Sequence, residues 1–230
     1  IESWISNQSS TLVAVIDTGV DSEHPALKNR LWKNTADTPN NGRDDDRNGY
    51  IDDSLGWNTV DQTHDVTDTL GHGTHVTGII AADPEYAEGV TGIGKGCQVL
   101  PIKAANQRGV FTSLSVALAI DYALMMGADV INLSLGSPKQ HVPEERVLRD
   151  AVATAVNEGV WVVAAAGNQG IDIDQHEYVP AIYDDVIAVA ALTYDKQIAG
   201  YSNYGDSVDV LAPGGSFKAG IKSTLPRSKA

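Results

Sequence analysis

The segment Thr11-Leu12-Val13-Ala14-Val15-Ile16-Asp17-Thr18-Gly19 determines the fold class of this sequence. Its first six residues are largely apolar and β-branched, a pattern typical of a strand that is buried on both faces of a sheet. The run ends at Asp17, and Gly19 follows two residues later. The pattern therefore predicts a buried strand that turns sharply after a carboxylate, although an ordinary Asx turn at a strand end would look the same.

Similar apolar runs recur along the chain, with helical patterns between them. Further strands are predicted at Cys97–Ile102, Val130–Leu133, Val160–Ala164 and Val186–Ala190. Helices are predicted from Leu114 to Met126, with Ser113 as the cap, and from Pro143 to Gly159. Strands that alternate with helices predict a single α/β domain over residues 1–230, a three-layer α/β/α sandwich with a mainly parallel central sheet. Functional sites of such sheets lie at the carboxyl ends of the strands.

Composition narrows the functional classes. The 230 residues are 42% hydrophobic, which is enough for a substantial core. They carry 16 Lys and Arg against 30 Asp and Glu, a net charge of −14, which disfavours nucleic acid as a partner. The sequence contains no apolar run long enough to span a membrane. The single Cys97 excludes an internal disulfide and is equally compatible with the cytosol and with a secreted enzyme stabilised by a metal. The acidic balance favours a secreted or extracellular protein over a cytoplasmic one.

Two further segments carry side chains that can perform acid–base chemistry. His72 stands in Gly71-His72-Gly73-Thr74-His75 at the start of a predicted helix of small residues, and Asn168 follows the strand that ends near Ala164. A lone histidine is often structural, and His72 with His75 could alternatively ligate zinc in a zinc hydrolase. An Asn after a strand is often turn chemistry, but its amide could also stabilise an oxyanion.

Together the segments around Asp17, His72 and Asn168 resemble the signatures of the subtilisin-like serine proteases, the subtilases, and they occur in that family's order. More matches follow along the chain: Ser22-Glu23-His24-Pro25, Asn132-Leu133-Ser134-Leu135-Gly136, Tyr201-Ser202-Asn203-Tyr204-Gly205 and Leu211-Ala212-Pro213-Gly214. The resemblance implies a serine endopeptidase in which Asp17 orients His72. His72 would be the general base and then the general acid, and Asn168 the oxyanion donor.

The resemblance also implies how a peptide substrate binds. The first substrate-flanking strand would comprise Ser134, Leu135 and Gly136, and the second Gln107, Arg108 and Gly109. The pocket for the residue before the scissile bond would be lined by Ala165, Ala166 and Gly167. Because these lining residues are small, we expect a wide pocket that prefers a large apolar side chain.

The nucleophile of the family, a serine in a Gly-Thr-Ser-Met-Ala type segment, has no counterpart in this sequence. Ile221–Pro226 resembles the stretch that precedes that serine, so we expect the domain to be incomplete and inactive alone. Our preferred explanation is that a C-terminal fragment of the same precursor carries the serine, released by autoprocessing in an exposed basic loop at Lys218–Ala230. The alternatives are a truncated chain and a catalytically inactive subtilase-fold module with a binding or regulatory role.

The stretch Asp44–Asp53 predicts a calcium loop. Its oxygen ligands match positions 1, 3, 5, 7 and 9 of an EF-hand-type loop, namely Asp44, Asp46, Asn48, the carbonyl of Tyr50, and Asp52. The twelfth position is Leu55, so Asp53 is expected to complete the ligand shell. A second calcium site, common in the family, is in doubt because Ala26 stands where many subtilases have an Asp; Asp83 or Glu88 could substitute.

Overall fold

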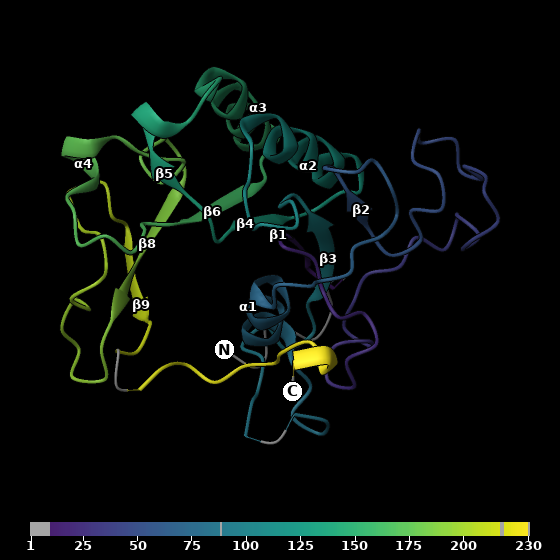
Figure 1. The fold of residues 1–230 in the computed structure, drawn as a ribbon, viewed down its shortest axis with the longest axis horizontal. Helices are drawn as coiled ribbons and strands as arrows, with labels where there is room; N and C mark the ends of the chain where they lie inside the picture. Colours follow the sequence, from purple (N-terminus) through teal and green to yellow (C-terminus); the bar gives the residue numbers. More distant parts are fainter. Residues whose placement is uncertain (1–9, 88, 217–218, 230) are drawn as a thin grey trace.

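The computed structural model describes residues 10–87, 89–216 and 219–229, and its centre is a seven-stranded sheet (Figure 1). The strands are β1 (Leu12–Asp17), β2 (Trp57–Asn58), β3 (Gln98–Lys103), β4 (Val130–Leu133), β6 (Trp161–Ala165), β8 (Ile187–Leu192) and β9 (Val210–Pro213). They lie in the order β2-β3-β1-β4-β6-β8-β9, and every neighbouring pair is parallel. The sequence of β1 places it near the middle, where both of its faces are buried.

Helices cover both faces of this sheet (Figure 1). The helices α2 (Ser113–Met125) and α3 (Glu145–Asn157) pack on one face, over a core that includes Ile16, Ile120 and Leu133. The helix α1 (His72–Ala81) packs on the other face, over Val15 and Val99. The predicted three-layer α/β/α architecture is therefore confirmed. Within the described ranges, no helix is long and apolar enough to cross a membrane.

Short elements complete the chain. The strands β5 (Ser137–Pro138) and β7 (Tyr178–Val179) form a separate antiparallel pair, in which Ser137 lies opposite Val179 and Pro138 opposite Tyr178. The remaining elements are the one-turn helix α4 (Ile173–His176) and the 3₁₀ turns η2 (Lys139–His141) and η3 (Arg227–Lys229). The β5–β7 pair is important for the site because it ties the segment after β4 to the segment that carries Tyr178.

The strand and helix predictions are correct to within about two residues, but the residues that cap the two predicted helices differ from the expected ones. Thr112, not Ser113, caps α2, because its side chain accepts the backbone N–H of Ser115 while the Ser115 hydroxyl accepts that of Thr112. Pro143 lies before α3, and Glu144 is the cap, with φ of 54°. The prediction also missed β2 and β9, which are two and four residues long and have no extended apolar run.

Candidate active site

The predicted functional residues follow four strands of the sheet. β1 ends at Asp17, β3 at Lys103, β4 at Leu133 and β6 at Ala165. Because these strands are parallel neighbours, their carboxyl ends lie along one edge, and the segments that follow them gather there. This edge is therefore the candidate active site.

Asp17 and His72 lie together at the centre of the edge. Nδ1 of His72 is 2.7 Å from Oδ1 and 2.9 Å from Oδ2 of Asp17, although the residues are 55 positions apart in the sequence. The Asp17 side chain is 1% exposed, whereas that of His72 is 54% exposed. A buried carboxylate thus holds one nitrogen of the ring, and Nε2 is left as the nitrogen that can exchange a proton with a substrate or nucleophile.

The position of His72 depends on a close approach between α1 and the turn after β1. A Cβ at Gly73 would lie 2.1 Å from the carbonyl oxygen of Gly19, so no larger residue fits there. The backbone N–H of Gly73 also donates to the Thr18 hydroxyl, at 2.8 Å. The glycine after His72 therefore permits the contact that brings the imidazole to Asp17.

Asp68 is a second buried carboxylate at the start of α1, and the sequence analysis missed it. Its Oδ1 accepts the Thr18 hydroxyl and the backbone N–H groups of Leu70 and Gly71, and its Oδ2 accepts both the N–H and the hydroxyl of Thr74. An Asp ahead of a predicted helix is a recognisable capping signal, so the sequence did contain a clue. Asp68 anchors the first turn of α1 and places a negative charge near His72.

The surroundings of His72 favour its protonated form. The hydrogen bond to the Asp17 carboxylate raises the pKa of His72 above its ordinary value, burial opposes that shift, and the charges of Asp17 and Asp68 add to it. A histidine with this environment is suited to accept a proton during a reaction and to hold it briefly as an imidazolium ion.

Asn168 is exposed in the loop that follows β6, and the side chain of Asn203 forms hydrogen bonds with the backbone of this loop. Asn203 is fully buried; its Nδ2 donates to the carbonyl of Ala166, at 2.7 Å, and its Oδ1 accepts the N–H groups of Gln169 and Ile171. The sequence analysis named Asn203 only as part of a motif and assigned it no role. The structure shows that Asn203 fixes the backbone on both sides of Asn168.

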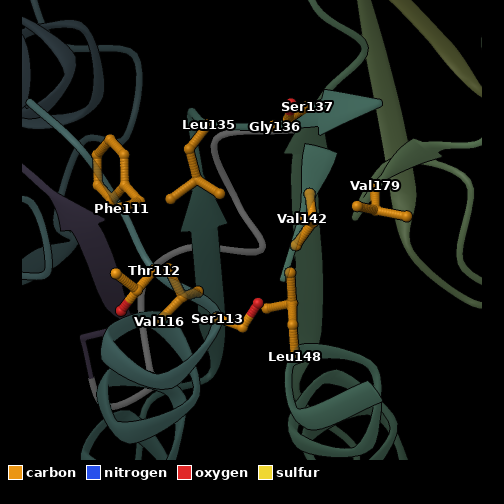
Figure 2. Close-up of a pocket in the computed structure, with 10 residues that line it drawn as sticks. All are labelled: Phe111, Thr112, Ser113, Val116, Leu135, Gly136, Ser137, Val142, Leu148 and Val179. Carbon is orange, nitrogen blue, oxygen red and sulfur yellow. The ribbon is translucent and has the colours of Figure 1, made fainter. Parts of the chain in front are cut away.

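The two predicted substrate-flanking segments border two different pockets. Gln107, Arg108 and Gly109 form the tip of a hairpin that is closed by pairing of Ala105 with Phe111. Ser134, Leu135 and Gly136 follow β4. Leu135 and Gly136 line a cavity of about 180 Å³, into which Phe111, Val116, Leu135, Val142, Leu148 and Val179 point their side chains (Figure 2). Gln107 and Arg108 line a separate, more polar pocket with Asp65 and Lys103.

Beside Gly167, the space expected to be a wide pocket lined by Ala165, Ala166 and Gly167 holds an aromatic ring. The ring of Tyr178 occupies the space between Gly136 and Gly167, and its hydroxyl donates to the Gly136 carbonyl oxygen at 2.9 Å. The prediction failed because it considered only the small residues on the pocket wall. A side chain from β7, which is remote in the sequence from Gly136, fills the space.

The C-terminal segment, expected to be an exposed loop at Lys218–Ala230, is exposed at most of its described residues but packs against α1 at Thr224 and Pro226, which are buried; Lys218 and Ala230 lie outside the described residues. Thr224 is buried, and its hydroxyl donates to the carbonyl of Thr74 at 2.7 Å. The Arg227 guanidinium pairs with Asp21, with 3.0 Å between Nε and Oδ2. The segment thus runs alongside the helix that begins at His72, as the yellow chain in Figure 1 shows.

The acidic loop brings some of its predicted calcium ligands together but not all. The amide Nδ2 of Asn34 donates to both Asp46 and Asp53 at 2.8 Å, and Nδ2 of Asn48 contacts the same two carboxylates at 3.2 and 3.0 Å. Asp44 accepts the backbone N–H groups of Asn48 and Gly49 in the same turn. Asp46 and Asp53 therefore converge on shared amide donors, with Asp44 on the adjacent backbone.

The remaining predicted ligands of the loop have other contacts. The Asp52 carboxylate accepts the backbone N–H groups of Asn41 and Gly42, on a different part of the loop from Asp53. The Tyr50 ring packs edge-on against Trp57 and Tyr122, with ring centroids 5.0 and 4.8 Å apart. Asp52 is thus directed away from the carboxylates that share the amides.

Asp53 is the most unusual carboxylate of this loop. It is fully buried, and its side chain accepts hydrogen bonds from Asn34, Asn48 and the Tyr122 hydroxyl, all neutral donors. Burial raises the pKa of Asp53, these hydrogen bonds oppose the shift, and the charge of Asp46 adds to it. Asp53 is thus a buried carboxylate whose hydrogen-bond partners are all neutral N–H or O–H donors.

Among the described residues, however, no group of three or more His, Cys, Asp and Glu side chains is arranged to hold a metal ion. In the acidic loop, amide groups stand between the carboxylates. His72 and His75 do not form part of such a group either, and Nδ1 of His72 faces Asp17. At the second predicted calcium site, Asp83 pairs with Arg30 at 3.3 Å, and Glu88 lies outside the described residues.

Comparison with known proteins matches nearly the whole chain to one family. The family model of the subtilases matches residues 8–229. The chain is 40% identical over 202 residues to the thermophilic serine proteinase of Bacillus sp. (strain AK1), covering 88% of this chain and 43% of that protein. It is 35% identical to the major intracellular serine protease of Bacillus subtilis (strain 168), over 94% of this chain and 60% of the relative. The chain thus spans about half the length of these relatives.

Solved structures agree with the sequence comparison. A lanthipeptide protease superimposes with a TM-score of 0.73 at 27% identity, covering 96% of this chain and 62% of the other. A cold adapted subtilisin-like serine proteinase gives a TM-score of 0.72, also at 27% identity, covering 94% of this chain and 65% of the other. Both similarities extend over nearly all of this chain.

Proposed function

The chain belongs to the subtilase family, and on that premise we propose that it is the larger part of a serine endopeptidase that cleaves peptide bonds through an Asp-His-Ser triad. The observation that carries the proposal is the buried Asp17 carboxylate bound to Nδ1 of a half-exposed His72. The serine would lie on a segment that follows residue 230 in the complete protein. This chain alone would then be inactive.

The reaction would proceed by acyl transfer. His72 removes the proton from the serine hydroxyl as its oxygen attacks the carbonyl carbon, and Asp17 stabilises the imidazolium ion. Asn168 donates a hydrogen bond to the oxyanion of the tetrahedral intermediate. His72 then protonates the leaving amine as the peptide bond breaks. Water, deprotonated by His72, hydrolyses the acyl-enzyme and regenerates the serine.

The peptide substrate would bind as an added strand between two segments. Its backbone would lie between the hairpin tip at Gln107–Gly109 and the segment Ser134–Gly136. An apolar substrate side chain fits the open cavity, since six apolar side chains line it (Figure 2). Extended binding of this kind supports a peptide or protein as substrate.

One face of β6 and β8 is only partly covered, which supports the proposal that a further segment packs there. In β6, Val162 and Ala164 are buried under α2 and α3, whereas the alternate residues Val163 and Ala165 are only half-buried. Val163 lies beside Ile187 of β8, which is also half-buried. Inner strands of a parallel sheet are normally covered on both faces. We propose that the serine-bearing segment covers this face, as a companion chain cleaved from the same precursor.

We also propose that the acidic loop binds Ca²⁺. The ligands would be the carboxylates of Asp44, Asp46 and Asp53, with oxygen atoms of Asn48 and Tyr50; Asp52 is left out because it binds Asn41 and Gly42. The ion would supply the positive charge that Asp53 lacks and would require the amides of Asn34 and Asn48 to turn away. A loop of this type suits an extracellular setting, where calcium is abundant. Relatives are named as intracellular and as extracellular proteases.

A fluorophosphonate probe on the full-length protein or its processed complex tests the enzyme proposal. The probe should label a serine on a fragment other than this chain, which intact mass would identify. His72→Ala should slow labelling by about 10²- to 10⁴-fold, since it removes the general base. His141→Ala, at an exposed histidine in η2, is the matched control and should label normally. Absence of labelling in the unmodified protein would contradict the proposal and favour an inactive binding module.

A further inference from the structure

Tyr178 lies in the slot between two backbone segments of the candidate active site. A Cβ placed on Gly136 would be 2.6 Å from Cε1 of Tyr178, and one placed on Gly167 would be 2.6 Å from its Cζ. Both glycines therefore contact the ring directly, one on the segment after β4 and the other on the segment after β6. The ring therefore occupies the space between these two segments.

Several contacts hold the ring in this slot. The Tyr178 hydroxyl donates to the carbonyl oxygen of Gly136 at 2.9 Å, and the residue is 3% exposed. Its backbone belongs to β7, which pairs with β5 immediately after Gly136. Movement of the ring out of the slot would break the hydrogen bond and expose an aromatic side chain to water.

The neighbouring residue of the same strand points elsewhere. Side chains alternate along a strand, so Val179 faces the opposite way from Tyr178 and lines the open apolar cavity with Leu135 (Figure 2). The ring of Tyr178 thus fills the space between Gly136 and Gly167, whereas the side chain of Val179 lines a cavity of about 180 Å³. Discrimination between substrates should follow this difference.

We propose that Tyr178 closes the pocket for the residue before the scissile bond, so that the protease prefers a small residue, Gly, Ala or Ser, at that position. This inference rests on the proposed peptidase function and makes Tyr178 its specificity-determining residue. An apolar residue of the substrate would bind instead in the cavity beside Leu135. The chain would recognise peptides with a small residue at the cut and an apolar residue farther from it.

The test uses the full-length protein and a peptide series that differs only in the residue before the cleaved bond: Ala, Leu or Phe. We expect kcat/KM for Ala to exceed that for Phe by about 10- to 100-fold, because a filled pocket excludes the larger side chain. Tyr178→Gly should reverse the order. Tyr178→Phe keeps the ring without the hydroxyl and should retain the preference for Ala. Thermal unfolding checks that each variant is folded.

A binding measurement separates this inference from the peptidase proposal. Product peptides that end in Ala or Phe at the same position need no nucleophile, and their Kd values should show the same order and the same reversal in Tyr178→Gly. Selective binding without cleavage supports the role of Tyr178 and contradicts the peptidase function. Equal cleavage or binding of Ala and Phe peptides by the unmodified protein overturns the inference, as does a folded Tyr178→Gly variant with unchanged preference.

Discussion

Two fully buried carboxylates, Asp17 at the edge formed by the carboxyl ends of the strands and Asp53 in the acidic loop, have opposite surroundings. Asp17 faces an imidazole that can become a cation, and the contact raises the pKa of His72. Asp53 meets only neutral donors in Asn34, Asn48 and Tyr122, and burial raises its own pKa. Burial of a charge is therefore compensated within the chain at one site, whereas the other lacks a positive partner.

The two sites also differ in how they are assembled. Asp17 and His72 are 55 residues apart, and strands and helices of the core bring them together. The carboxylates of the acidic loop bind mainly groups within about twenty positions, such as Asn34 with Asp53, 19 residues apart. A site built from core elements keeps its geometry without a ligand. We expect the acidic loop, by contrast, to depend on one.

The largest effect is expected from a substitution that disrupts the contact between Asp17 and His72. Asp17→Asn should lower kcat/KM of the complete enzyme by about 10⁴-fold, because the amide neither fixes the tautomer of His72 nor stabilises its charge. His72 must be neutral to accept a proton, so activity falls as the pH drops through its pKa. Removal of Asp17 lowers that pKa and moves the acid limb to lower pH. A profile of kcat/KM against pH measures both effects, with Asp195→Asn, at an exposed loop, as control.

The contact between Asp17 and His72 also makes the stability of the folded protein depend on pH. Because folding raises the pKa of His72, the pair stabilises the protein fully below the unfolded value of about 6.5. This contribution is lost as the pH rises through the folded pKa. Denaturant titrations of Asp17→Asn at several pH values should therefore show the largest loss at acid pH. A difference that grows toward alkaline pH would contradict the assignment.

A smaller effect is expected when calcium supplies the missing positive charge at Asp53. Calcium at 100 times its Kd should raise the free energy of unfolding by about 2.7 kcal/mol, and EGTA should reverse this. Asp53→Asn should abolish most of the calcium response. Asp45→Asn removes the same charge from an exposed residue of the same loop and should keep the response. The measurement is thermal unfolding with and without calcium. If the unfolding temperature of the unmodified protein does not change with calcium, the proposal that the loop binds Ca²⁺ is wrong.

The smallest effect concerns the amide that stands between Asp46 and Asp53. In EGTA, Asn34→Ala should lower the free energy of unfolding by about 1.5 kcal/mol, because two carboxylates lose a shared donor. In saturating calcium the loss should shrink, since the ion replaces that donor. Denaturant titrations in both conditions measure the difference. An equal loss in both would show that Asn34 and calcium do not occupy the same place.

The sequence alone determined the class of fold and the central pair of the site. Long apolar runs predicted the strands because burial on both faces leaves a continuous hydrophobic signature, as in β1. Asp17 and His72 were predicted because their segments resemble, in order, the signatures of the subtilases. The short strands β2 and β9 left no comparable pattern, and neither did the start of α3 at Glu144.

Only the tertiary structure decided which space at the site is open and which is filled. Asn203 and Tyr178 act through contacts with segments that are distant in the chain, and residue pattern does not specify such contacts. The slot between Gly136 and Gly167 looked wide because its walls are small, yet Tyr178 enters it from β7. Local sequence determines local structure and the identity of reactive groups. The shape of a pocket depends on every side chain that the fold brings to it.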